Sequence, residues 1–102
     1  ESSMKNISKV IWSQRAKTDL KLILAYLEEN WTEKEIGKFF RKLDKQISII
    51  QNQPNAFPAA QKNNVRRSVL SGQTTIYYDF LKDSVRIVAL FDNRQSPGKL
   101  NL

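Results

Sequence analysis

The segment between Trp31 and Pro54 constrains the fold of this 102-residue chain more than any other stretch. Thr32, followed three residues later by Glu35, forms a capping box and predicts a helix start, while Pro54 predicts that the helix ends at Gln53. The apolar side chains of this segment fall on one arc of a helical projection and the basic ones on the opposite arc. The apolar positions are Ile36, Phe39, Phe40, Leu43, Ile47 and Ile50, and the basic positions are Lys34, Lys38, Arg41, Lys42 and Lys45. The sequence therefore predicts an amphipathic helix roughly 30 Å long.

A shorter β-prone run and another amphipathic helix precede this segment. The run "KVIWS" ends in Ser13, which can cap a helix from Gln14 to about Asn30 whose apolar residues recur at helical spacing. Because only Trp31 and Thr32 separate the two predicted helices, the helices must form an antiparallel hairpin. The shared apolar face of that hairpin needs a cover.

Three strand-like runs in the second half can supply the cover. They are "VRRSVL" at 65–70, "TTIYYDFL" at 74–81 and "VRIVALF" at 85–91, joined by short turns that favour antiparallel neighbours. In the middle run, Ile76, Tyr78 and Phe80 share one face. The predicted fold is α+β, ordered β-α-α-β-β-β, with the helical hairpin packed on one face of a small antiparallel sheet and the other face free for a partner. Aromatic residues expected in the core are Trp12, Phe39, Phe40, Tyr78 and Phe80.

Length and composition favour one small intracellular domain with an acidic partner. We expect a single domain over 1–102, with Met4 as the natural start, 1–3 as a cloning remnant and 4–8 as flexible. Lys and Arg outnumber Asp and Glu by 17 to 10, which gives a net charge of +7 that suits nucleic acid or an acidic protein segment. The chain has no cysteine and no apolar run near the roughly 18 residues that a membrane span needs. The expected location is the cytoplasm, with no membrane contact.

Four stretches in this order resemble a known family. They are "VIWSQRAKTDLKLILAYL", "QNQPNAFP" after the long helix, "VRRSVLSGQTTIYYDF" and "VRIVALFDNRQSPGKL". Together they make the chain, from Lys9 to Leu100, similar to the RelE/ParE superfamily of toxins from bacterial type II toxin-antitoxin modules. The ending, a hydrophobic strand followed by Arg94 and a Pro-containing tail, resembles the ParE-like branch.

The resemblance implies a small cytoplasmic toxin of the plasmid-stabilisation type. A cognate antitoxin encoded by an adjacent gene would neutralise it by wrapping a C-terminal segment over its surface. In the ParE-like branch, which we favour, the target is DNA gyrase; in the RelE-like branch the toxin enters the ribosome and cleaves mRNA. Since one fold serves both functions, the fold cannot choose between them. A non-toxic interaction module of the same fold is a third alternative.

The chemistry that a nuclease needs is only partly present. A metal-independent ribonuclease must deprotonate a ribose hydroxyl, stabilise the charge on the phosphate and protonate the leaving oxygen. The chain has no histidine, and its tail has no tyrosine, so Tyr77 or Tyr78 would have to supply an acid or a stacking ring. The catalytic candidates in the RelE-like case are Lys62, Arg66, Arg67 and Arg94. We expect no metal site, because the acids after residue 60 are too few, and no cofactor.

Binding residues are expected at the sheet rim and on the long helix. Arg94 is the first candidate, with a surface ion pair to Asp92 as its ordinary alternative; its replacement by alanine should abolish growth arrest and change stability by less than about 1 kcal/mol. Arg66 and Arg67 must point to opposite faces, one of them pairing with Asp79. The basic helix face is either solvated or a docking surface for an acidic antitoxin segment. The full set for target or antitoxin binding is Arg66, Arg67, Tyr77, Arg94, Lys99, Lys38, Arg41 and Lys45.

Overall fold

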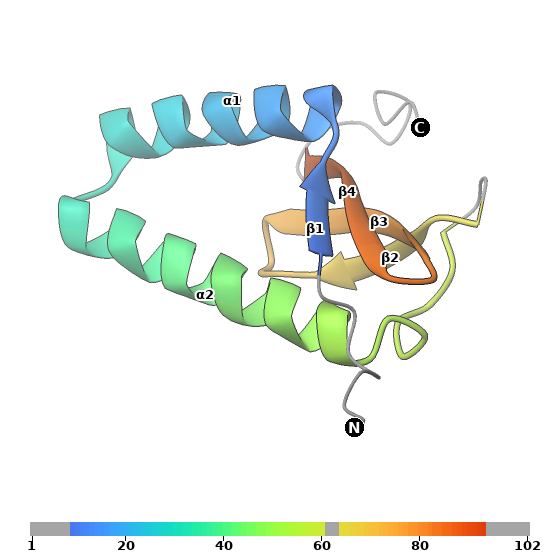
Figure 1. The fold of residues 1–102 in the computed structure, drawn as a ribbon. Coiled ribbons are helices and arrows are strands. Elements are labelled where there is room, and N and C mark those ends of the chain that lie inside the picture. Colours follow the sequence, from blue (N-terminus) through green and yellow to red (C-terminus); the bar gives the residue numbers. More distant parts are fainter. Residues whose placement is uncertain (1–8, 61–63, 94–102) are drawn as a thin grey trace.

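The computed structural model describes residues 9–60 and 64–93, which hold two helices and four strands (Figure 1). The elements are β1 (Lys9–Trp12), α1 (Gln14–Asn30), α2 (Glu33–Asn52), β2 (Arg66–Val69), β3 (Thr74–Leu81) and β4 (Ser84–Asp92). The predicted α+β class and the β-α-α-β-β-β order are confirmed. Residues 1–8, for which a remnant, a start and a flexible segment were expected, lie outside the described residues.

The four strands form one mixed sheet in the order β1-β4-β3-β2. As predicted, β3 pairs antiparallel with both β2 and β4. β1 then adds to the other side of β4 in the parallel direction, with Lys9 opposite Ser84 and Trp12 opposite Ile87. The helical hairpin makes this possible, because a parallel neighbour needs a long connection that crosses from one end of the sheet to the other.

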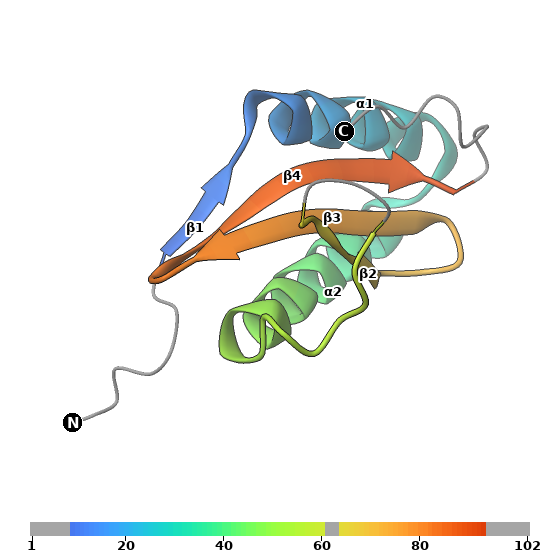
Figure 2. The same cartoon turned by 90° about the vertical axis from the view of Figure 1, so that its right-hand side faces the viewer.

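Both helices pack on the same face of the sheet, as the sequence predicts (Figure 2). The buried core on this side consists of Ala16, Leu27, Phe39, Leu43, Ile47, Ile50, Leu70, Ile76, Tyr78, Val85, Ile87 and Leu90. Of the expected core aromatics, Phe39 and Tyr78 are buried, while Trp12, Phe40 and Phe80 are half-buried against the same cluster. A hydrogen bond from Gln46 Nε2 to Ser68 Oγ, 2.6 Å long, ties α2 to β2 inside this layer.

A bulge in β4 decides which of its side chains reach the helices. Tyr77 lies opposite Ala89, but Tyr78 lies opposite Ile87, so Val88 is an extra residue in the ladder. Ile87 and Leu90 consequently both join the helix-side core although they are three residues apart. Ala89 packs on the opposite face.

α1 supplies polar side chains to the part of β4 that β1 does not cover. Beyond Trp12 the chain turns into α1, where Ser13 Oγ accepts the Ala16 N–H at 2.9 Å and donates to the Val88 carbonyl at 2.8 Å. Further along α1, Asp19 Oδ2 accepts the Leu90 N–H at 3.0 Å. Ser13 is therefore both the predicted helix cap and a link between α1 and the sheet.

Replacement of Asp19 by alanine is expected to lower the free energy of unfolding by about 2 kcal/mol, because the Leu90 N–H loses its acceptor in a part-buried position. Asp19→Asn is the matched control: its amide oxygen can still accept this hydrogen bond, and only the partly exposed ion pair with Arg15 is lost. Urea denaturation followed by circular dichroism measures both. Equal losses in the two variants would contradict this account.

Candidate functional site

The face of the sheet turned away from the helices, which we call the outer face, carries a second buried cluster. It consists of Val65, Tyr77, Ala89 and Phe91, with Ala60 and Val88 packed against it. The expectation that this face is free for a partner is therefore wrong at its centre. Tyr77, expected as a residue that stacks on a partner, is only 9% exposed.

The segment between α2 and β2 extends the sheet edge beside this cluster. The Arg67 N–H donates to the Pro58 carbonyl at 3.0 Å, and the Ala60 N–H donates to the Val65 carbonyl at 2.7 Å. These bonds hold Ala60 and Val65 against the outer face, where they pack with Tyr77. The covering of Tyr77 thus follows from backbone pairing that joins residues several positions apart.

Arg66 and Arg67 point to opposite faces, as predicted. Arg66 is half-buried: its Nη1 donates to the Phe57 carbonyl at 2.6 Å, and its guanidinium lies 5.8 Å from the centre of the Phe80 ring. Arg67 is exposed and sits opposite Tyr77 in the ladder. The expected pairing of one of these arginines with Asp79 is wrong, because Asp79 binds Arg86 instead.

Asp79 and Arg86 form a bidentate ion pair across β3 and β4. Arg86 Nε donates to Asp79 Oδ1 at 3.1 Å, and Arg86 Nη2 donates to Oδ2 at 2.5 Å. The hydrogen bonds and the negative charge of Asp79 raise the pKa of Arg86, against a smaller opposing effect of burial. The pair borders a hollow of about 340 Å³ that Ile11 and Leu81 also line. The sequence contains a signal for it, since counting outward from the 82–83 turn brings these two residues opposite each other.

Tyr78 lies on the helix side and holds the start of the loop after α2. Its hydroxyl donates to the Pro54 carbonyl at 2.6 Å, and its ring meets that of Phe57 edge-on at 6.3 Å. Burial raises the pKa of Tyr78 to about 12, although the positive charge of Arg66 acts in the opposite direction. Tyr78 therefore lies on the helix side of the sheet, and Tyr77, although it lies on the outer face, has a largely buried side chain, so neither is an open stacking ring of the kind that a nuclease would use.

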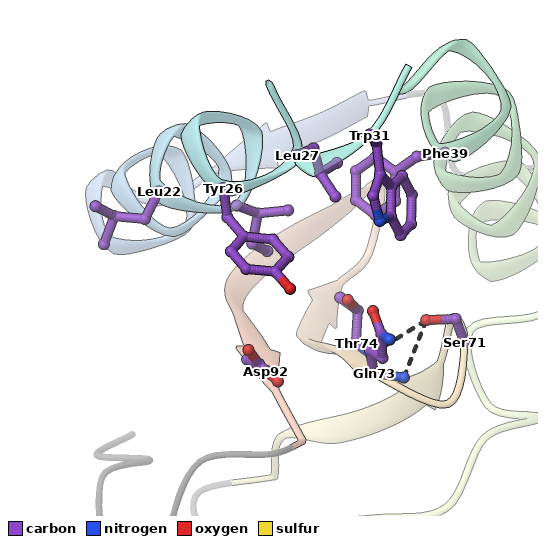
Figure 3. A pocket seen from close by; sticks show the side chains of 10 residues that line it. Leu22, Tyr26, Leu27, Trp31, Phe39, Ser71, Gln73, Thr74 and Asp92 are labelled. Atoms are coloured by element: carbon purple, nitrogen blue, oxygen red, sulfur yellow. Dashed lines mark hydrogen bonds between the residues drawn. The ribbon is translucent and has the colours of Figure 1, made fainter. Parts of the chain in front are cut away.

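The polar break after Phe91 fastens the end of β4 to the β2–β3 turn. The Asn93 N–H donates to the Gln73 carbonyl at 2.7 Å, and Thr75 Oγ1 donates to Asn93 Oδ1 at 2.7 Å. The turn itself is closed by Ser71 Oγ, which accepts the backbone N–H groups of Gln73 and Thr74 (Figure 3). Asn93 therefore links the end of β4 to the β2–β3 turn and the start of β3 by hydrogen bonds. Sequence patterns did not indicate this role.

The remaining predicted site residues are exposed or outside the described residues. Lys38, Arg41 and Lys45 all lie exposed on α2. Lys62, Arg94 and Lys99 fall in segments that the structure does not describe, so their roles stay predictions.

Within 9–60 and 64–93, no group of three or more His, Cys, Asp or Glu side chains is arranged to hold a metal ion. None of the helices there is long and apolar enough to span a membrane.

A hollow of about 260 Å³ opens between α1, Trp31 and the β2–β3 turn (Figure 3). Leu22 and Tyr26 line it from α1, and Trp31 and Phe39 stand beside each other at its inner end. Gln73 and Asp92 line it from the sheet side. The sequence placed Trp31 only between the two predicted helices, so its place in the lining of a hollow is new.

The sequence profile of a toxin family matches most of the chain. Residues 10–97 match the family described as the ParE toxin of the type II toxin-antitoxin system parDE. The protein therefore belongs to the ParE toxin family of type II toxin-antitoxin systems, within the RelE/ParE superfamily that the sequence resembles. A comparison with curated proteins finds no significant match.

Solved structures share the fold at low sequence identity. The chromosomal ParDE toxin-antitoxin system from P. aeruginosa matches with a TM-score of 0.70 at 15% identity, covering 84% of this chain and 96% of that one. The DinJ-YafQ toxin-antitoxin complex from E. coli matches with a TM-score of 0.63 at 12% identity, covering 93% and 99%. A metal-bound toxin from Helicobacter pylori matches with a TM-score of 0.54 at 13% identity, covering 84% and 94%. At these identities the likeness establishes the two-helix, four-strand fold.

Proposed function

We propose that this ParE-family toxin stops growth by binding DNA gyrase and does not act by cutting mRNA. The observation that carries the choice is the buried apolar cluster at the centre of the outer face, built around Tyr77 and Phe91. An enzyme that cleaves RNA without a metal needs ionisable groups that converge on a ribose and a phosphate. A buried apolar cluster offers no such groups, so the centre of the outer face gives little support to nuclease chemistry.

The charged groups around this cluster fit binding better than proton transfer. Both oxygens of the Asp79 carboxylate accept hydrogen bonds from Arg86, so this carboxylate is already engaged in an ion pair within the sheet. Arg67 is exposed and can contact an acidic partner, but a guanidinium does not give up its proton at neutral pH. Together with a net charge of +7, these groups favour attraction of a negatively charged macromolecule.

We further infer that a cognate antitoxin, encoded beside the toxin, holds it inactive in the cytoplasm. The support is the family itself and the fold shared with the ParDE system from P. aeruginosa and the DinJ-YafQ complex from E. coli. The antitoxin and the target need not use the same surface. The basic face of α2, with Lys38, Arg41 and Lys45, is available to the first and the rim around Arg67 to the second.

The proposal is tested by inducing the toxin in a bacterial host without an antitoxin and by adding purified toxin to gyrase and supercoiled DNA. We expect growth arrest, induction of the DNA-damage response and accumulation of gyrase-cleaved DNA. Arg94→Ala should lose all three effects, whereas Lys82→Ala, an exposed change in the β3–β4 turn, should retain them.

Other outcomes assign the protein to the alternatives. Arrested translation with cut messages and no DNA damage would replace the proposal by a RelE-like mRNA endonuclease, for which Lys62, Arg66, Arg67 and Arg94 are the candidates. Arrest of neither process would leave a non-toxic interaction module. Unchanged toxicity of Arg94→Ala would remove that residue from the target contact.

A further inference from the structure

A groove on the α2 side of Trp31 combines an apolar base with a basic rim. It has a volume of about 340 Å³, and Phe39 and Leu70, both buried, lie at its base. Trp31, Phe39 and Ser71 line both this groove and the hollow on the α1 side, so the two spaces adjoin each other. Figure 3 shows Trp31 and Phe39 across the hollow from the turn that carries Ser71. We call this feature the Trp31 groove.

Two lysines give the rim of the Trp31 groove its charge. Lys38 and Lys42 lie one helical turn apart on α2 and both line the groove. Neither forms an ion pair with any of the residues that the structure describes. Glu35 is the acid on this rim, and it is engaged in the helix cap, where it accepts the Thr32 N–H at 3.0 Å.

The groove divides the basic face of α2 into two parts. Lys38 and Lys42 border an apolar hollow, whereas Lys34, Arg41 and Lys45 do not line it. If the basic face of α2 only contacted water, its lysines would not need to border an apolar hollow. Lys38 and Lys42 do border one, which favours docking. The predicted basic face included both groove lysines, Lys38 and Lys42, but the shorter predicted binding set of Lys38, Arg41 and Lys45 left Lys42 out, because helical periodicity alone cannot show where β2 ends against α2.

These features define the chemistry of an occupant. The buried side chains of Phe39 and Leu70 match an apolar anchor, which gains free energy by leaving water. The ammonium groups of Lys38 and Lys42 match carboxylates placed on either side of that anchor. A nucleic-acid backbone would satisfy the lysines but would leave the apolar base unfilled. The combination favours an acidic peptide with a large aliphatic or aromatic side chain.

We propose that the Trp31 groove binds an acidic segment of the antitoxin by an apolar anchor flanked by Asp or Glu, with Lys38 and Lys42 as its specificity-determining residues. The assignment of this acidic segment to the antitoxin rests on the proposed function. The chemistry of the segment is inferred from the groove alone. Binding here blocks neither Arg67 nor the outer face directly, so the groove acts as an anchor for a partner that reaches further.

The test uses the full chain and a synthetic probe, a 15-residue amphipathic peptide with leucine at helical spacing and glutamate between. The control peptide has glutamine in place of each glutamate. An oligouridylate of eight nucleotides tests whether nucleic acid binds the groove instead. The readout is the indole N–H resonance of Trp31 in a titration by nuclear magnetic resonance. The glutamate peptide should shift this resonance, and Lys38→Gln/Lys42→Gln should weaken its binding about tenfold. Lys17→Gln/Lys21→Gln removes the same charge from two exposed positions of α1, also four residues apart, and should weaken it less than about twofold.

A complete lack of peptide binding at Trp31 overturns the inference, and so do three further results. They are equal losses in the two double variants, a Trp31 shift that the glutamine peptide produces as strongly, and a Trp31 shift produced by the oligouridylate but not by the peptide. Growth arrest measured in parallel separates this inference from the proposed function. If the wild-type toxin arrests growth by trapping gyrase but binds no peptide at Trp31, the proposed role of the groove is wrong and the proposed function stands. If the protein binds the peptide at Trp31 but has no effect on gyrase, the proposed gyrase target is wrong and the inference about the groove stands.

Discussion

Replacement of Ile87 by alanine is expected to lower the free energy of unfolding by about 3 to 4 kcal/mol. Ile87 is completely buried at the junction of three strands, opposite Trp12 of β1 and Tyr78 of β3. Its carbonyl also accepts the Ser13 N–H at 3.0 Å, where the chain leaves β1 for α1. Alanine removes three side-chain carbons and leaves a cavity that rigid strands on both sides cannot fill.

Urea denaturation followed by far-ultraviolet circular dichroism measures this loss. Leu81→Ala is the matched control, because Leu81 is also an aliphatic residue of the sheet but is 77% exposed at the β3–β4 turn. Its replacement should change stability by less than about 0.5 kcal/mol. A loss below about 1 kcal/mol for Ile87→Ala would mean that β1, β3 and β4 do not meet around this side chain.

The two helices were predictable to within a residue because their signals are local. Ser13 caps α1 and Thr32 forms a complete capping box with Glu35, so each helix begins where the sequence indicates. α2 ends at Asn52, one residue before the predicted limit, with Gln53 as its cap ahead of Pro54. Signals of this kind act within four residues and do not depend on the rest of the fold.

The sheet was predictable where adjacent strands are joined by short turns. β3 and β4 pair around the 82–83 turn, so the alternation that places Ile76 and Tyr78 on one face follows from the pleat. The parallel pairing of β1 with β4 joins residues more than seventy positions apart, for which a four-residue strand carries no pattern. The bulge at Val88 also left no local signal, although it decides that Leu90 faces the helices.

In the candidate site too, features set by local strand geometry were predictable, and features set by contacts with distant segments were not. The opposite directions of Arg66 and Arg67 followed from strand geometry, but the partners of Arg66 did not, since the Phe57 carbonyl reaches it through an irregular loop. The burial of Tyr77 depends on Val65 and Ala60 packing over it, a contact made by that same loop. Side-chain position on a strand was therefore predictable, and its surroundings were not.

The protein is expected to lose about 2 to 3 kcal/mol of stability between pH 10 and pH 12 through Tyr78 alone. In the unfolded chain the pKa of this tyrosine is near its ordinary value of 10.0, whereas burial in the folded chain raises it to about 12. Below pH 10 both states keep the proton, and the contribution is fully present. As the pH rises through this range the unfolded chain releases the proton first, so unfolding becomes progressively more favourable.

Tyr78→Phe isolates this effect, because it removes the titrating group and keeps the ring. At pH 7 the variant should be less stable by about 1 kcal/mol, since the Pro54 carbonyl loses the donor that now lies 2.6 Å away. Between pH 10 and pH 12 the stability difference should shrink and then reverse, because lysines titrate alike in both proteins while only the wild type carries Tyr78. Urea midpoints at pH 7, 9 and 11.5 measure the difference. Parallel pH profiles for the two proteins would mean that the Tyr78 hydroxyl is solvated in the folded chain, and the hydrogen bond that fastens the α2–β2 loop to the core would then be absent.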